Sequence, residues 1–159
     1  MCGIFCLLNA NTDKQPEGSK LSKVNIEASF MKGKNRGPER SSISFTDNMI
    51  MGFHRLAING YKNEDSGQPI VKDNCTLICN GEIYNWEYLS KISDTVCSSG
   101  SDCEIIINLY RKYGIEKTLQ LIDGVFAFVL IDQSDNNVFI ARDALGIRPL
   151  FIWSNDRAL

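Results

Sequence analysis

The chain begins Met1-Cys2-Gly3-Ile4-Phe5-Cys6-Leu7-Leu8, a cysteine followed by an apolar run that predicts a buried strand over residues 3–8. Removal of the initiator methionine is routine before a small second residue, and it leaves a thiol and a free α-amine on Cys2. An α-amine has a pKa of about 7.7–8.0, so near neutral pH part of it is an unprotonated base. Cys2 could therefore carry both a nucleophile and its general base. The alternative is that Cys2 is a small apolar residue opening a buried strand.

The bulk composition fits one compact globular domain, with 159 residues of which 43% are hydrophobic. Seventeen basic and 19 acidic residues are scattered along the chain and give a net charge of −2, so neither a nucleic acid nor a membrane partner is expected. No apolar stretch approaches the roughly 20 residues that span a bilayer, and the N-terminus does not resemble a signal peptide. These features predict a cytoplasmic protein.

The six cysteines lie at positions 2, 6, 75, 79, 97 and 103. Their uneven spacing, without a signal peptide, favours reduced thiols over the disulfide framework of a secreted protein. The chain has one histidine and no C-x-x-C pair. We therefore expect no metal site.

Hydrophobic periodicity and turn residues predict several antiparallel strands and three or four amphipathic helices. Together these elements predict an α+β sandwich in which helices cover stacked sheets. The Asn-Gly pair at 80–81 predicts a turn, and Ser101 with Glu104 predicts a capping box at a helix start. The other expected elements are a helix around 26–34, a hairpin of 42–45 with 49–53 continuing through 58, a strand at 76–79, a hairpin of 125–132 with 138–141, and a strand at 149–153.

Four polar residues stand at the expected strand ends or helix starts: Arg55, Asn80, Glu82 and Asp102. Each alone has a simpler interpretation. Arg55 and Glu82 could be solvated charges, Asn80 part of an ordinary turn, and Asp102 an acid favoured by a helix dipole. The segments around them carry more information together than singly.

Those segments, with the Met-Cys-Gly-Ile start, resemble the glutaminase domain of class II glutamine amidotransferases, within the N-terminal-nucleophile hydrolases, and most closely its asparagine synthetase branch. The resemblance implies a four-layer αββα sandwich of two antiparallel sheets flanked by helices. Glu39 departs from the family's usual Asp, and Asn59 from its usual apolar residue. The matching segments are residues 36–38, 52–58, 68–70, 80–85, 100–104, 123–128, 142–143 and 146–151.

The resemblance implies that Cys2 attacks the side-chain amide of glutamine, with its own α-amine as base, and forms a γ-glutamyl thioester. The amide of Asn80 and the N–H of Gly81 are implied as the oxyanion donors. Arg55 would bind the α-carboxylate of glutamine, and Glu82 and Asp102 its ammonium group. Backbone groups would complete the substrate site at Leu56, Ala57, Ile58 and Asn59.

The resemblance also sets the expected domain, cofactors and partners. Residues 1–159 would form a type 2 glutamine amidotransferase domain, shortened at its C-terminal end, with the synthetase domain absent. No Ser-Gly-Gly-x-Asp-Ser phosphate loop occurs in the sequence, so ATP and Mg²⁺ are expected only in the missing synthetase domain and no cofactor in the glutaminase domain. The expected partners are L-glutamine, a synthetase domain or subunit, and a second copy in a homodimer.

Two alternatives remain open. The domain could belong to another class II amidotransferase, such as an amidophosphoribosyl or glucosamine-phosphate enzyme, or it could be a catalytically silent glutamine-binding or regulatory module. A Cys-His hydrolase using His54 is disfavoured, because neighbours on a strand point to opposite faces and Arg55 is needed in the site. The segment containing Arg142, Asp143 and Arg148 is interpreted as structural.

Overall fold

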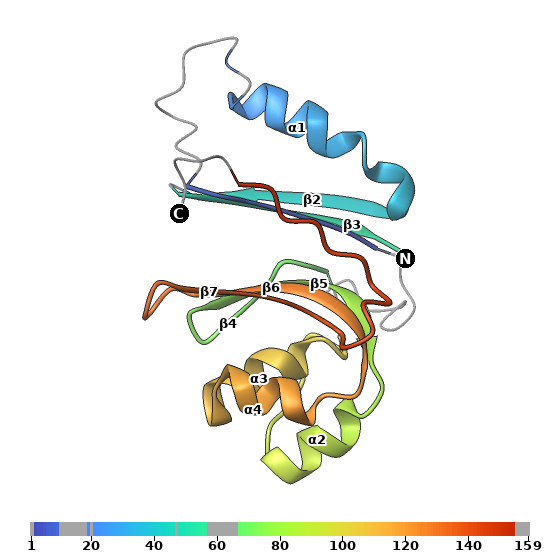
Figure 1. Cartoon of the computed structure of the whole chain (residues 1–159), viewed down its shortest axis with the longest axis vertical. Helices are drawn as coiled ribbons and strands as arrows, with labels where there is room; N and C mark the ends of the chain where they lie inside the picture. The colour runs from blue at the N-terminus through green and yellow to red at the C-terminus, as the bar shows by residue number, and fades with distance from the viewer. Residues whose placement is uncertain (1, 10–18, 20, 47, 57–66, 155–159) are drawn as a thin grey trace.

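A computed structural model describes residues 2–9, 19, 21–46, 48–56 and 67–154. Two antiparallel sheets form its centre (Figure 1). The three-stranded sheet has the order β1-β3-β2 and the four-stranded sheet the order β4-β5-β6-β7. The strands are β1 (Gly3–Leu8), β2 (Arg40–Phe45), β3 (Met49–Arg55), β4 (Ile70–Lys72), β5 (Cys75–Ile83), β6 (Gly124–Asp132) and β7 (Asn137–Arg142).

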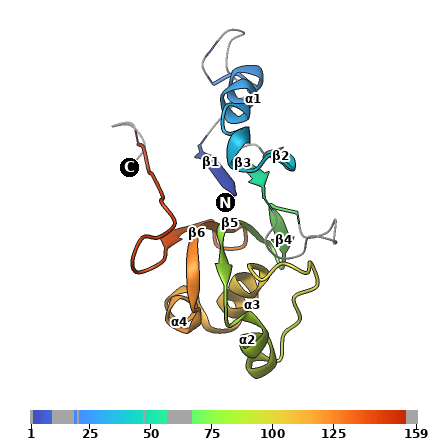
Figure 2. The same ribbon diagram turned by 90° about the vertical axis from the view of Figure 1, so that its right-hand side faces the viewer.

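Helices cover the outer face of each sheet, which confirms the predicted four-layer α+β sandwich (Figures 1 and 2). One helix lies over the three-stranded sheet and three lie over the four-stranded sheet. In the described part of the chain, no helix has the length and apolar character needed to cross a membrane. The helices are α1 (Lys23–Met31), α2 (Trp86–Ser93), α3 (Glu104–Tyr113) and α4 (Ile115–Leu121), with a short 3₁₀ turn, η2 (Lys34–Arg36).

Strand alternation explains the layers. Ile4 and Met51 of the three-stranded sheet pack with Ile78 and Val129 of the four-stranded sheet, between the two sheets. The alternate residues of β1 and β3 pack instead under α1. On the far side, Leu77, Phe128 and Leu130 form the largest apolar cluster with Ile105, Ile106 and Leu109 of α3.

The hairpins predicted from the sequence are confirmed as β2–β3 and β6–β7, and the first strand is confirmed as β1. The expected helix around 26–34 starts earlier and ends earlier, at Lys23 and Met31. The hydroxyl of Ser22 accepts from the N–H of Asn25 at 3.4 Å and caps its start. The expected continuation of β3 stops at Arg55, and positions 57–58 lie outside the described residues.

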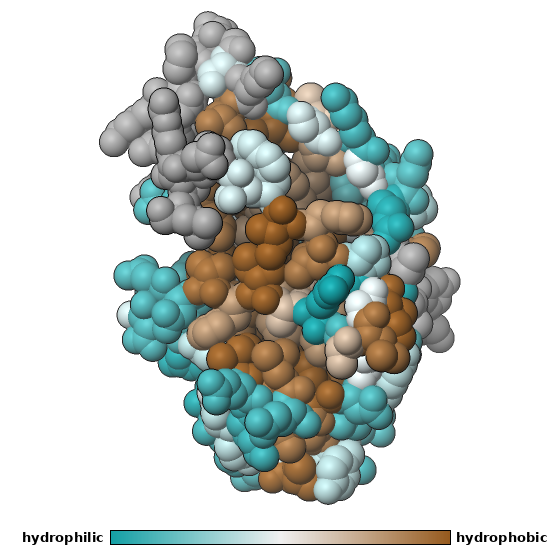
Figure 3. Space-filling model, in the orientation of Figure 1, coloured by the Kyte–Doolittle hydropathy of each residue, from teal (hydrophilic) through white to brown (hydrophobic). Residues whose placement is uncertain are grey.

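Two expectations about strands are wrong. Asn80-Gly81 is not a turn, because β5 continues through it and pairs Asn80 with Ala127 and Gly81 with Phe126. The expected strand at 149–153 is absent from the described residues of that segment, which form an irregular stretch with exposed apolar side chains. Figure 3 shows apolar surface over the middle of the face that this segment crosses in Figure 1.

Candidate active site

Cys2 lies immediately before β1, at the end of the three-stranded sheet. Its thiol contacts the backbone of Leu56, just beyond β3, with Sγ 3.3 Å from the carbonyl oxygen and 3.4 Å from the nitrogen that donates to it. By the alternation of β1, Cys2 shares the face of Ile4 and Cys6, which points toward the four-stranded sheet. The thiol is therefore held between the two sheets and beside Arg55.

The surroundings of Cys2 keep its thiol protonated at neutral pH. Burial raises the pKa of the Cys2 thiol above its ordinary value, and the hydrogen bond from Leu56 opposes this shift only in part. A thiol of this kind needs a base before it can attack. The site thus calls for a proton acceptor close to Sγ.

Arg55 ends β3 on the same face as Phe53 and lines a cavity of about 240 Å³. The preceding Arg36-Gly37-Pro38 segment packs against this strand end, because a Cβ on Gly37 would lie 2.2 Å from the carbonyl oxygen of His54. Only a glycine fits so close to the backbone that carries Arg55. The cavity is lined by Arg40, Ser42, Phe53, Arg55, Gly67, Gln68 and Pro69.

His54 points to the opposite face of β3, toward α1. Its ring stacks on Phe30 with centroids 3.9 Å apart, and its Nε2 lies 2.9 Å from the Phe30 carbonyl oxygen. A carbonyl only accepts, so Nε2 carries the proton and Nδ1 accepts from the Ser41 hydroxyl at 2.7 Å. His54 is therefore occupied in the outer layer and does not face Cys2.

Asn80 and Glu82 lie on β5 with side chains on the face of Ile78, which points toward the three-stranded sheet. Asn80 is buried and Glu82 half-buried. Between them, Gly81 lies against β6, where a Cβ would meet the carbonyl oxygen of Val125 at 2.5 Å. This close approach explains why an Asn-Gly pair continues a strand here.

Backbone hydrogen bonds fix the direction of the Gly81 N–H. The N–H of Cys79 donates to Gln68 Oε1 at 2.5 Å, and the N–H of Ile83 donates to Asp102 Oδ2 at 2.7 Å. Both N–H groups point away from β6. The N–H of Tyr84 points to the β6 side, where it donates to the carbonyl oxygen of Asp123. Alternate residues of a strand direct their backbone groups to the same side. The N–H of Gly81 therefore points to the side of Gln68 and Asp102.

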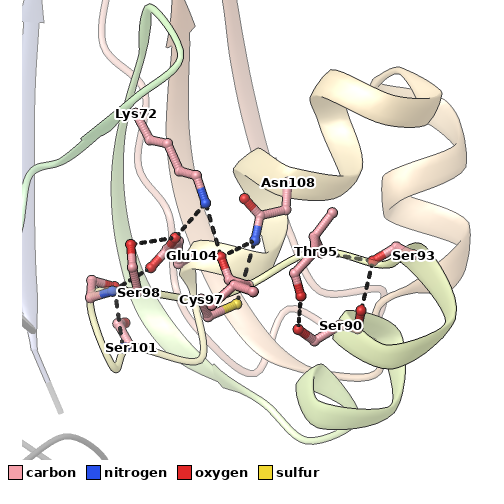
Figure 4. Close-up of polar contacts among 11 residues, drawn as sticks. Lys72, Ser90, Ser93, Thr95, Cys97, Ser98, Ser101, Glu104 and Asn108 are labelled. Carbon is pink, nitrogen blue, oxygen red and sulfur yellow. Dashed lines mark hydrogen bonds and ion pairs between the residues drawn. The ribbon is translucent and has the colours of Figure 1, made fainter.

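Asp102 is buried and joins the end of β5 through its bond to Ile83, next to Glu82. The loop before it is held by Glu104, whose carboxylate lies 2.7 Å from Lys72 Nζ and accepts from the N–H of Ser99 at 2.7 Å (Figure 4). Burial alone would raise the pKa of Glu104, but the bonds from Lys72 and Ser99 outweigh it and lower the pKa. This network fixes the loop that delivers Asp102.

The predicted capping box at Ser101 and Glu104 is wrong. Helix α3 begins at Glu104, and its N-cap residue, Cys103, makes no side-chain cap bond. The Glu104 carboxylate instead bonds Lys72 of the distant strand β4 and the N–H of Ser99. The carboxylate that the local sequence pattern assigned to the helix cap is therefore used in a tertiary contact.

The structure thus directs the side chains of Cys2, Arg55, Asn80 and Glu82 into the space between the sheets, with Asp102 at the adjoining end of β5. Leu56 contacts Cys2, while Ala57, Ile58 and Asn59 lie outside the described residues. Among the side chains that the structure describes, no three His, Cys, Asp or Glu groups gather as metal ligands would.

Sequence reasoning missed Gln68 as a residue of this site. Its side chain is bonded to Cys79, next to Asn80, and it lines the cavity with Arg55. The sequence offered only its membership in the segment at 68–70, because no periodic pattern assigns a partner to a polar residue before a proline.

A cysteine that opens an inner strand of a four-layer αββα sandwich fits the arrangement expected of a glutamine amidotransferase domain. The family model described as "Glutamine amidotransferase domain" matches residues 1–159, and the chain belongs to this family.

Its relatives include proteins named as glutamine-hydrolysing asparagine synthetases. The chain is 37% identical to the one from Sandersonia aurantiaca, over 98% of this chain and 29% of the relative. It is 38% identical to asparagine synthetase 2 of Arabidopsis thaliana, over 98% of this chain and 26% of the relative. The chain thus spans little more than a quarter of the length of these relatives.

Proposed function

We propose that the protein hydrolyses L-glutamine to glutamate and ammonia, with Cys2 as the nucleophile. The observation that carries this proposal is the position of the Cys2 thiol, which the backbone of Leu56 holds between the two sheets. Arg55 from β3, and Asn80 and Glu82 from β5, point into the same space. Membership in the amidotransferase family supports the same reaction.

In the proposed reaction, removal of Met1 frees the α-amine of Cys2. This amine takes the thiol proton as sulfur attacks the side-chain amide carbon, and a tetrahedral intermediate forms. The proton then goes to the leaving nitrogen, the C–N bond breaks, and ammonia departs from a γ-glutamyl thioester. Water cleaves the C–S bond, which releases glutamate and restores the thiol.

Asn80 and Gly81 are proposed to stabilise the oxyanion of this intermediate. The Asn80 side chain points from β5 toward the three-stranded sheet that carries Cys2 and Arg55, and strand alternation directs the Gly81 N–H away from β6. Donors already fixed before the reaction are effective because no reorganisation is needed when charge develops. Loss of one such donor lowers kcat by roughly 10²- to 10³-fold.

The α-carboxylate and the α-ammonium group of glutamine require binding residues of opposite charge. We propose that Arg55 binds the α-carboxylate, in a cavity of about 240 Å³, and that Glu82 and Asp102 bind the ammonium group. The bond between Asp102 and Ile83 brings the second acid to the residue next to Glu82. Backbone groups of residues 56–59 would complete the contacts with the substrate.

We further propose that the ammonia serves the ATP-dependent amidation of aspartate in a cytoplasmic asparagine synthetase. ATP and Mg²⁺ would bind a synthetase domain or subunit, and the glutaminase step would need no cofactor. Relatives with this printed name support the assignment. So do the exposed apolar side chains of Leu145, Phe151 and Trp153, at 83–92% exposure, which suit a contact with another domain.

The test is glutamate release by the purified protein, compared with its Cys2→Ala variant. The proposal predicts turnover of glutamine that the variant loses, together with ammonia in equal amount. Glutamine binding without turnover, in protein whose Met1 has been removed, would instead identify a silent binding module.

A further inference from the structure

The side chain of Gln68 takes the place of a missing strand beside β5. Its Oε1 accepts from the N–H of Cys79 at 2.5 Å, and its Nε2 donates to the carbonyl oxygen of Cys79 at 3.1 Å. Strand β4 pairs with β5 only at residues 75–77, so it ends before Cys79. One primary amide therefore satisfies both backbone groups that a neighbouring strand would otherwise bind.

Gln68 also connects three parts of the candidate site. Its partner Cys79 directly precedes Asn80 on β5, and its side chain lines the cavity that contains Arg55. Its own carbonyl oxygen accepts from the Ser42 hydroxyl of β2, so it links the two sheets. Gln68 is only 7% exposed, and a buried amide with both functions bonded holds one orientation.

We propose that Gln68 is a positioning residue for glutamine hydrolysis. By clamping both backbone groups of Cys79, it fixes the strand at the point where the Asn80 amide and the Gly81 N–H leave it. This inference rests on the proposed function, since it assigns Gln68 an effect on the oxyanion donors. It acts through Cys79 and is not expected to touch the substrate amide.

The chemistry of the clamp requires an amide. Gln68→Glu keeps an acceptor for the Cys79 N–H but removes the donor to its carbonyl oxygen. Gln68→Met has similar length and removes both bonds. The two variants therefore weaken the clamp to different degrees while keeping most of the packing.

The experiment measures kcat and KM for glutamine in the full protein with Gln68→Glu and Gln68→Met. We expect kcat to fall roughly 10- to 100-fold, as for a catalytic group displaced by about 1 Å, and to fall further in Gln68→Met. KM should change little, because Arg55, Glu82 and Asp102 remain. Gln120→Met, on the exposed surface of α4, is the matched control and should keep wild-type kinetics.

A double variant separates positioning from general damage. In an Asn80→Ala background, Gln68→Met should reduce kcat by a much smaller factor than in the wild type, because one of the groups it positions is gone. The same factor in both backgrounds, or a rise in KM at unchanged kcat, would overturn the inference. If Gln68→Met does not fold, the same comparison is made with Gln68→Glu.

The controls keep the two proposals distinguishable. A wild-type protein with Met1 removed and no glutaminase activity would refute the proposed function itself. An active wild type whose folded Gln68 variants keep full kcat would refute only the role of Gln68.

Discussion

In the proposed reaction the nucleophile is Cys2, whose half-buried thiol has a raised pKa and therefore stays protonated at neutral pH. At pH values below this raised pKa, ionisation of the thiol therefore contributes little to the pH dependence of the reaction. The neutral α-amine is the proposed proton acceptor, with a pKa of about 7.7–8.0 in an ordinary N-terminus.

This assignment predicts a pH profile. Because only the neutral amine can take the thiol proton, kcat/KM should fall about tenfold per pH unit below the amine pKa. Glutamate release measured from about pH 6 to about pH 9 tests it. A flat profile over that range would show that another group, or none, accepts the proton.

The guanidinium of Arg55 is the group proposed to bind the α-carboxylate of glutamine. Arg55→Lys keeps the positive charge but loses the planar fork that grips a carboxylate with two parallel bonds. KM for glutamine should rise roughly 10- to 100-fold, equivalent to about 1.5–3 kcal/mol, with a smaller change in kcat. Arg142→Lys, at an exposed position, is the control and should leave both constants unchanged. Unchanged KM in Arg55→Lys would remove Arg55 from the substrate site.

His54 should matter for stability rather than for chemistry. His54→Gln loses the stacking on Phe30 and weakens the bonds to Ser41 and the Phe30 carbonyl. The free energy of unfolding should fall by about 1–3 kcal/mol, while kcat changes by less than a factor of a few. Urea unfolding and steady-state kinetics on the same preparation check both. A folded variant without activity would revive a Cys-His mechanism.

At the scale of elements, the turn after β7 depends on one buried carboxylate. Asp143 accepts from the backbone N–H groups of Phe126 at 3.2 Å, Ile147 at 2.8 Å and Arg148 at 3.0 Å. Burial alone would raise the pKa of Asp143, but these three donors, together with the backbone of Leu145, outweigh it and lower the pKa. The charged form therefore stabilises the fold.

The Asp143→Asn variant should lose about 1–3 kcal/mol of unfolding free energy at neutral pH, because one carbonyl oxygen cannot serve three donors. A lowered pKa gives stability that is complete above the ordinary aspartate value of about 3.9 and is lost as pH falls through the lowered value. The difference in unfolding free energy between the variant and the wild type should therefore become smaller at acidic pH. Urea unfolding at about pH 7 and about pH 3 measures it, and an equal gap at both would contradict this role.

The sequence predicted those elements whose pattern and environment agree. The hairpins β2–β3 and β6–β7 have apolar residues suited to a two-sided sandwich, and their turns are local. It failed at Asn80-Gly81, where contact between Gly81 and the β6 backbone overrides the turn preference, and at Glu104, which bonds Lys72 from a distant strand. Both failures come from tertiary contacts that no local rule contains.

Tertiary contacts also explain why the sequence indicated some residues of the candidate site and not others. Cys2, Arg55, Asn80 and Asp102 stand in recognisable segments at strand ends or helix starts. Gln68 does not, because its role depends on where β4 stops pairing and on an amide that reaches Cys79 instead. A side-chain amide that replaces a neighbouring strand can be recognised only when the pairing of the strands is known.

At the scale of the whole molecule, the stacked sheets bring together segments far apart in the chain. Cys2 and Leu56 come from the three-stranded sheet, and Asn80 and Glu82 from the four-stranded sheet that faces it. The helices pack on the outer apolar face of each sheet. The candidate site lies between the inner faces of the two sheets. The proposed catalysis therefore depends on both sheets of the sandwich and not on either sheet alone.

The decisive measurement for Cys2 as the nucleophile is the intact mass of the protein before and after exposure to 6-diazo-5-oxo-norleucine, a glutamine-like electrophile, with the adduct located by peptide sequencing. If Cys2 is a working glutaminase nucleophile, the chain lacks Met1 and carries one adduct, on Cys2, whose formation is slowed by excess glutamine. A chain without Met1 whose Cys2 stays unlabelled, or labelling that glutamine does not affect, would contradict a working glutaminase nucleophile.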